Sequence, residues 1–114
     1  MKSGRVDLDY LQDMLDACIK ATDFIKTMTI GEFMGDEKTQ FAVVRALEII
    51  GEASKKISQP FKDQNPEIPW KVIAGMRDKM IHDYMGVNKT VVWKTVIQDI
   101  PPLIDLIHKS IDTA

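Results

Sequence analysis

Apolar residues recur at alternating spacings of three and four along most of the chain, the pattern of helices that each bury one face. One apolar row, within residues 7–28, contains Leu8, Leu11, Leu15, Cys18, Thr22 and Ile25. Another, within residues 37–62, contains Val43, Leu47, Ile50, Ser54, Ile57 and Phe61. They predict two long helices, with a break at residues 29–36 that contains two glycines and ends on Asp36 as a helix cap.

The second half of the chain predicts two further helices. Pro69 suits the first turn of a helix from Trp70 to about Tyr84, which places Ile73, Met76 and Met80 inward. Gly86 would close that helix, and Asn88 would cap the next. Pro101-Pro102 interrupts this last helix before a short apolar C-terminal segment. We therefore predict an all-α, antiparallel up-and-down bundle of four main helices, with residues 1–114 as one domain.

Composition narrows the function classes. The net charge of −2 argues against a protein that coats nucleic acid nonspecifically. One cysteine excludes an internal disulfide, and neither a leader-like nor a membrane-spanning apolar run is present, so we expect a cytoplasmic protein. Residues 71–94 contain five basic and two acidic side chains, a local excess of +3 that suits a small anionic ligand as well as it suits solvated helix faces.

The stretch from Arg77 to Tyr84 is the strongest candidate for chemistry. Arg77 can hold a phosphate through its planar donors, and His82 can move a proton near neutral pH, a combination that suits phosphodiester cleavage. Glu52 and Asp78 are possible supporting residues. Each residue also has a structural interpretation: Arg77 as a surface ion-pair partner, His82 as a helix-terminal charge, and Tyr84 as a half-buried aromatic. No cluster of histidines, cysteines and carboxylates predicts a metal, and no motif predicts a cofactor.

Helix geometry separates the candidate residues. At roughly 100° per residue, Tyr84 lies about 20° from Arg77, whereas His82 lies about 140° from Arg77. A single straight helix therefore makes a poor Arg–His site. Either the helix loosens near Gly86, or two chains pair so that both stretches face one phosphate; we favour a homodimer.

The chain resembles the HepT family of HEPN-domain proteins. The matching residues are the Arg-x4-His-x-Tyr motif at Arg77, His82 and Tyr84. The supporting segments span nearly the whole chain and comprise residues 36–39, 47–53, 66–70 and 101–103. The resemblance implies a four-helix HEPN homodimer with metal-independent endoribonuclease activity, in which Arg77 holds the scissile phosphate of RNA and His82 acts as general base or acid. It also implies the toxin role in a type VII toxin–antitoxin pair, with a minimal nucleotidyltransferase (MntA-like) antitoxin that adenylylates Tyr84.

Two alternatives remain open from the residues. The chain could be a non-catalytic subunit that binds a nucleotide or substrate within a nucleotidyltransferase complex, using the same basic stretch. It could instead be a purely structural helical dimer. The first alternative predicts saturable nucleotide binding without RNA cleavage, and the second predicts that Arg77→Ala changes nothing.

Overall fold

Every regular element of the described chain is helical. The computed structural model describes residues 6–85 and 88–113, with the side chains of residue 77 and residues 79–85 outside the description. The elements, in order, are α1 (Asp7–Ile25), α2 (Ile30–Met34), α3 (Glu37–Lys55), α4 (Gln59–Gln64), α5 (Trp70–Met85), α6 (Lys89–Lys94), a π-helical turn (Thr95–Asp99) and α7 (Ile100–Thr113). The predicted all-helical fold is confirmed, while the expected roles of Met80 and Gly86 fall outside the description.

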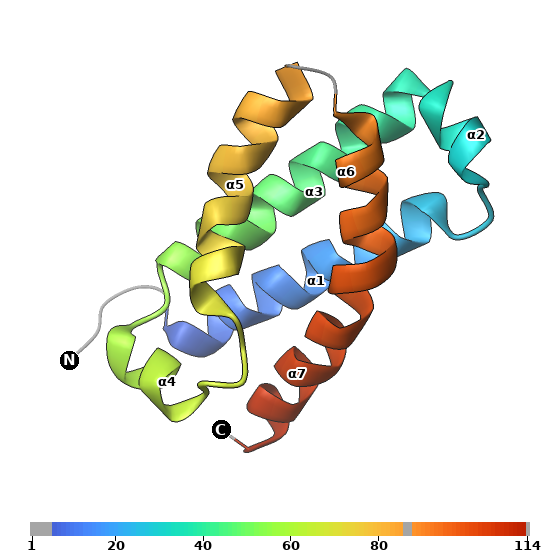
Figure 1. Ribbon diagram of the computed structural model, residues 1–114. Coiled ribbons are helices and arrows are strands. Elements are labelled where there is room, and N and C mark those ends of the chain that lie inside the picture. The colour runs from blue at the N-terminus through green and yellow to red at the C-terminus, as the bar shows by residue number, and fades with distance from the viewer. Residues whose placement is uncertain (1–5, 86–87, 114) are drawn as a thin grey trace.

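Four long helical stretches enclose the core (Figure 1). α3 packs between α1 and α5, and the column formed by α6, the π-helical turn and α7 crosses α1. The fully buried large side chains come from each of these stretches and include Leu11, Met14, Leu47, Ile50, Ile73, Val92, Ile100 and Ile107. This pattern agrees with the predicted bundle and with the inward positions of Ile73 and Met76. Leu8 differs: the predicted row places it inward, but its side chain is 43% exposed. No described helix is long and apolar enough to cross a membrane.

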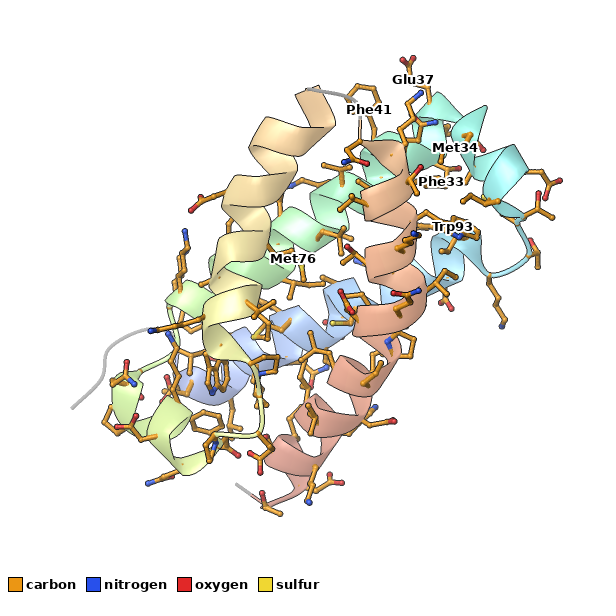
Figure 2. The ribbon with its side chains drawn as sticks, in the orientation of Figure 1. Phe33, Met34, Glu37, Phe41, Met76 and Trp93 are labelled. Atoms are coloured by element: carbon orange, nitrogen blue, oxygen red, sulfur yellow. The ribbon has the colours of Figure 1, made fainter. Side chains whose placement is uncertain are left out.

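The glycine-containing break folds back as the short helix α2. Thr29 caps it reciprocally: Glu32 donates its amide to the Thr29 hydroxyl at 3.2 Å, and the Thr29 amide donates to the Glu32 carboxylate at 2.8 Å. Phe33 is fully buried, and its ring lies 5.4 Å from that of Trp93 on α6 (Figure 2). α2 therefore closes this end of the bundle.

Asp36 caps α3 as predicted. Its carboxylate accepts hydrogen bonds from the Thr39 amide at 3.0 Å and the Thr39 hydroxyl at 2.8 Å. These bonds stabilise the ionised form and lower the pKa of the Asp36 carboxyl. Capping thus fixes where the helix that borders the candidate site begins.

The second long helix ends earlier than the apolar row predicts. α3 stops at Lys55, and Ser58 caps the separate helix α4 by accepting the Phe61 amide at 3.4 Å. Pro60 explains the break, because in a continuous helix its ring would clash with the carbonyl of Lys56. Ser58 also donates its amide and hydroxyl to the Asp7 carboxylate, at 2.8 and 2.6 Å, which ties this turn to the start of α1. The prediction of one helix over residues 37–62 was wrong.

Contrary to the prediction, Pro101-Pro102 does not interrupt the last helix. Both prolines lie in the first turn of α7, which follows the π-helical turn directly and extends to Thr113. The Ile100 amide bonds five residues back, to the Thr95 carbonyl. A proline ring strains an α-helix against the carbonyl four residues earlier, and a wider π turn relieves that crowding. The C-terminal segment is accordingly a 14-residue helix continuous with α6.

Cys18 is a core residue of α1, as its apolar neighbours predict. Its side chain is fully buried, and burial raises the pKa of the thiol to about 12. The thiol therefore stays protonated at neutral pH and is a poor nucleophile.

Candidate functional site

Helix α5 carries the Arg77–Tyr84 stretch. It is an unbroken α-helix from Trp70 to Met85, so positions 77 and 82 lie about 140° apart around its axis. The backbone stays helical as far as Met85, while Gly86, where the sequence allows the helix to loosen, lies outside the described residues. The side chains of Arg77, His82 and Tyr84 lie outside the described residues, and their roles stay predictions.

The described residues of α5 show which side of the helix is buried and which is exposed. Ile73 and Met76 are 1% and 8% exposed and face the core. Lys71, Gly75 and Asp78 are exposed, at spacings of four and three residues. Position 82 continues this outward series four residues after Asp78, whereas position 77 lies between the outward series and the core side.

An ion pair joins α3 and α5. Lys55 Nζ on α3 lies 3.6 Å from the Asp78 carboxylate on α5. Both side chains are substantially exposed, 43% and 59%, so the pair contributes only about 0–1 kcal/mol to stability. Asp78, a predicted supporting residue, therefore contacts the neighbouring helix through a lysine that the sequence pattern did not single out.

Glu52, the other predicted supporting residue, lies on α3 with Arg45 and Glu48, and these three side chains form a charged stripe. The Arg45 guanidinium donates to Glu48 at 3.4 Å and to Glu52 at 3.2 Å. Partial burial disfavours the charge of Arg45, but the bonds to the two carboxylates outweigh it and raise the pKa of Arg45. Arg45 and Glu48 thus form an ion pair one helical turn apart on the surface of α3.

The stripe runs beside the candidate stretch. α3 and α5 are antiparallel neighbours (Figure 1), and Lys55 is level with Asp78. Glu52 precedes Lys55 by about one turn of α3. Because the helices are antiparallel, it lies level with residues about one turn after Asp78 on α5, which are residues 81–82. The fold thus brings Glu52 level with the candidate stretch. Whether it orients Arg77 stays a prediction.

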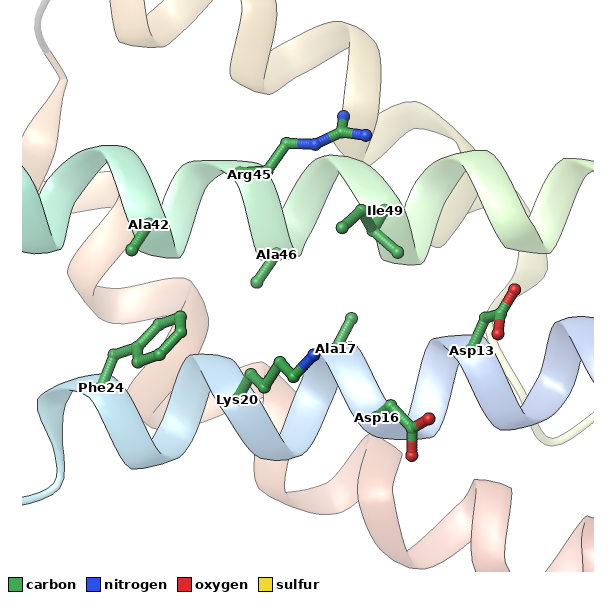
Figure 3. Close-up of a pocket in the computed structure, with 9 residues that line it drawn as sticks. All are labelled: Asp13, Asp16, Ala17, Lys20, Phe24, Ala42, Arg45, Ala46 and Ile49. Atoms are coloured by element: carbon green, nitrogen blue, oxygen red, sulfur yellow. The ribbon is translucent and has the colours of Figure 1, made fainter.

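A separate hollow of about 390 Å³ lies between α1 and α3 (Figure 3). Its described lining includes Ala17, Ala46 and Phe24, with Asp16 and Lys20 at its edge. Arg45 also lines it, but its side chain extends away from α1 (Figure 3). The lining residues belong to α1 and α3, so this hollow is distinct from the α5 stretch.

Within the part of the chain that the structure describes, no three histidine, cysteine, aspartate or glutamate side chains gather closely enough to hold a metal ion. His108, the other histidine, lies exposed on α7. The described charged contacts beside α5 are the Lys55–Asp78 pair and, on α3, the bond from Arg45 to Glu52.

Comparison with known proteins identifies the family. The family model described as "Ribonuclease HepT-like" matches residues 14–110. "Probable ribonuclease HepT" of Thermococcus cleftensis is 55% identical over 83% of this chain and 86% of its own length. Two proteins named "Putative RNase" are also similar. The one from Methanocaldococcus jannaschii is 45% identical over 81% of this chain and 76% of its own length, and the one from Caldanaerobacter subterraneus subsp. tengcongensis is 43% identical over 82% and 84%. No solved structure gave a significant match. The chain belongs to the HepT-like ribonuclease family.

Proposed function

We propose that the chain is a metal-independent endoribonuclease whose active site forms between two copies. The observation that carries the proposal is the Arg-x4-His-x-Tyr spacing on an uninterrupted helix, in a chain whose relatives bear ribonuclease names. Arg77 and His82 are the proposed catalytic residues. A homodimer brings Arg77 of one chain beside His82 of the other, because one helix holds the two positions apart.

In the proposed reaction, His82 of one chain takes the proton from the RNA 2′-hydroxyl. The 2′-oxygen then attacks phosphorus, and the bond from phosphorus to the 5′-oxygen breaks. The leaving 5′-oxygen takes a proton from solvent water and the protonated His82 gives its proton back to solvent, so one fragment ends in a 2′,3′-cyclic phosphate and the other in a 5′-hydroxyl. Arg77 stabilises the charge that builds on the phosphate oxygens.

We place Glu52 and Asp78 outside this reaction, as positioning residues. Glu52 lies level with the stretch and forms an ion pair with Arg45, while Asp78 forms one with Lys55. In this arrangement Asp78 links α5 to α3, Glu52 lies beside the stretch, and the proton transfer is left to histidine.

As a ribonuclease, the chain would act as the toxin of a toxin–antitoxin pair in the cytoplasm, where its RNA substrates are. Expression of the wild-type chain alone should arrest bacterial growth, and co-expression of its cognate nucleotidyltransferase should restore growth. The variant His82→Ala should be harmless in both cases. Equal growth arrest by wild type and His82→Ala would contradict a toxicity based on RNA cleavage.

Tyr84 is the proposed site of neutralisation. Its hydroxyl oxygen would attack the α-phosphorus of ATP, forming a tyrosyl–AMP bond and releasing pyrophosphate. The AMP group adds bulk and a negative charge one helical turn or less from His82, which repels an approaching RNA backbone.

The modification can be tested by intact mass. Incubation with the cognate antitoxin and ATP should add AMP to wild type and to Tyr10→Phe, but not to Tyr84→Phe. Tyr10 is the matched control because it is the only other tyrosine and lies on α1. AMP on Tyr84→Phe would contradict the assignment.

A further inference from the structure

A second hollow, of about 430 Å³, lies where α4 meets the start of α5. Its lining includes Lys62 and Asp63 of α4 and Trp70, Lys71 and Ala74 of α5. The sequence places Lys62 at the end of the predicted helix over residues 37–62 and Trp70 at the start of the next, without assigning either a function. The charge balance differs from that of the α1–α3 hollow, because two lysines accompany one carboxylate here, whereas one lysine and one arginine accompany two carboxylates there.

Trp70 is held in a fixed position at this hollow. Its indole N–H donates to the Asn65 carbonyl at 3.0 Å, and its ring packs partly against the core. Lys62 Nζ lies over one face of the ring, 5.8 Å from its centroid, so a base that stacks on this face takes the place of the lysine ammonium. A rigid aromatic with one accessible face is suited to stacking a nucleobase.

The charges at the hollow favour an anion. Lys62 and exposed Lys71 both line it, against the single described carboxylate of Asp63. One oxygen of that carboxylate accepts a hydrogen bond from Gln59 at 2.8 Å. Lysines beside an aromatic ring are the combination with which proteins bind single-stranded nucleic acid: the ring stacks a base and the lysines hold the backbone.

Trp70 at the hollow is aligned with position 77, that of one proposed catalytic residue. Trp70 and Arg77 are seven residues apart on α5, which places their positions within about 20° of each other and about 10 Å apart along the axis. At about 3.4 Å per stacked nucleotide, this separation spans about three nucleotides. The surface of α5 is open at Gly75, since no described atom outside the adjacent helix backbone lies within 4 Å of where a Cβ would be.

We propose that Trp70, Lys62 and Lys71 form a subsite for single-stranded RNA that stacks one base about three nucleotides from the scissile phosphate. The inference rests on the proposed ribonuclease function and specifies its substrate: an unpaired strand that lies along α5. A duplex does not fit this subsite, because its bases are already stacked and cannot reach the indole.

The test uses a ten-nucleotide 2′-O-methyl RNA, which has no free 2′-hydroxyl and is not cut whichever residue is catalytic. In a Trp93→Phe protein, Trp70 is the only tryptophan and reports on its own site. Titration with the single strand should quench its fluorescence saturably, and the same sequence in a duplex should not. Quenching by neither form, or equally by both, would overturn the subsite.

A pair of substitutions separates stacking from folding. Trp70→Leu and Trp70→Phe both lose the N–H bond to Asn65, but only phenylalanine keeps an aromatic face. With affinity measured by the anisotropy of a labelled strand, Trp70→Leu should bind about 5- to 150-fold more weakly than Trp70→Phe. Equal affinities of the two variants would overturn the stacking role.

The charge contribution has its own control. Lys71→Glu should weaken binding of the strand at least severalfold and reduce its salt dependence, whereas Lys26→Glu should change affinity little. Lys26 is also exposed but lies at the end of α1, where it lines a different hollow, with Val96 and Pro101. Equal effects of the two substitutions would overturn the role of Lys71.

Cleavage of the unmodified strand distinguishes this proposal from the one on which it rests. Trp70 quenching without cleavage would keep the subsite and reject the nuclease. Cleavage without Trp70 quenching would keep the nuclease and reject the subsite.

Discussion

His82→Ala should reduce RNA cleavage by about 10²- to 10⁴-fold while leaving the helical fold intact. The expected loss is large because histidine is the one residue of the proposed site that can both take and return a proton near pH 7. Position 82 follows exposed Lys71, Gly75 and Asp78 on the outward side of α5, so shortening it to alanine is not expected to open the core. Initial rates on a labelled RNA, with circular dichroism as the folding check, measure the effect.

His108→Ala is the matched control. It removes the only other histidine, which is exposed on α7, and should retain full activity. If wild type, His82→Ala and His108→Ala cleave at the same rate, the cleavage comes from a contaminant and the assignment of His82 fails.

Mixing inactive Arg77→Ala and His82→Ala chains should restore cleavage. Because α5 stays helical to Met85, we expect each site to take Arg77 from one chain and His82 from the other. After unfolding and refolding together, half of the dimers contain both variants, and one of the two sites in each is intact. The mixture should therefore recover about a quarter of wild-type activity, provided that the chains pair at random.

The control for this experiment replaces one partner with the double variant Arg77→Ala/His82→Ala. Mixing the double variant with Arg77→Ala provides no chain with an intact Arg77, so no activity should return. If the two single variants also stay inactive together, each site is built within one chain and the two-chain arrangement is wrong.

The sequence predicted the helices well where apolar periodicity and capping agree. Asp36, Trp70 and Asn88 mark the helix starts as expected, and Ile73 and Met76 lie inward. It failed where a proline competes with an apolar row. The row from Val43 to Phe61 continues through Pro60, but the backbone cannot, and the chain restarts at the Ser58 cap.

The opposite error occurred at Pro101-Pro102. Two prolines indicate a break, yet the chain stays helical because the preceding turn widens to a π-helix and the Ile100 amide bonds back to Thr95. Local propensity does not reveal such a rearrangement, since it depends on Val96, Ile100 and Leu103 all being buried in one core.

The residues of the candidate site stay predictions, and their surroundings could be predicted only in part. Helical periodicity alone separates Arg77 from His82 and thereby favours a second chain. The Lys55–Asp78 pair, and the position of Glu52 level with residues 81–82, depend on the antiparallel packing of α3 against α5. Spacing within one helix does not reveal that packing. The hollow at Trp70 needed the fold as well, because it forms only when α4 turns back beside α5.

The most direct test of the central claim compares cleavage of one RNA and its fully 2′-O-methylated twin by the purified wild-type protein in EDTA, with the product ends identified by mass spectrometry. The account predicts cleavage of the unmodified RNA only, with 2′,3′-cyclic phosphate and 5′-hydroxyl ends. Loss of cleavage in EDTA, or cleavage of the methylated twin, would contradict metal-independent attack by the 2′-hydroxyl.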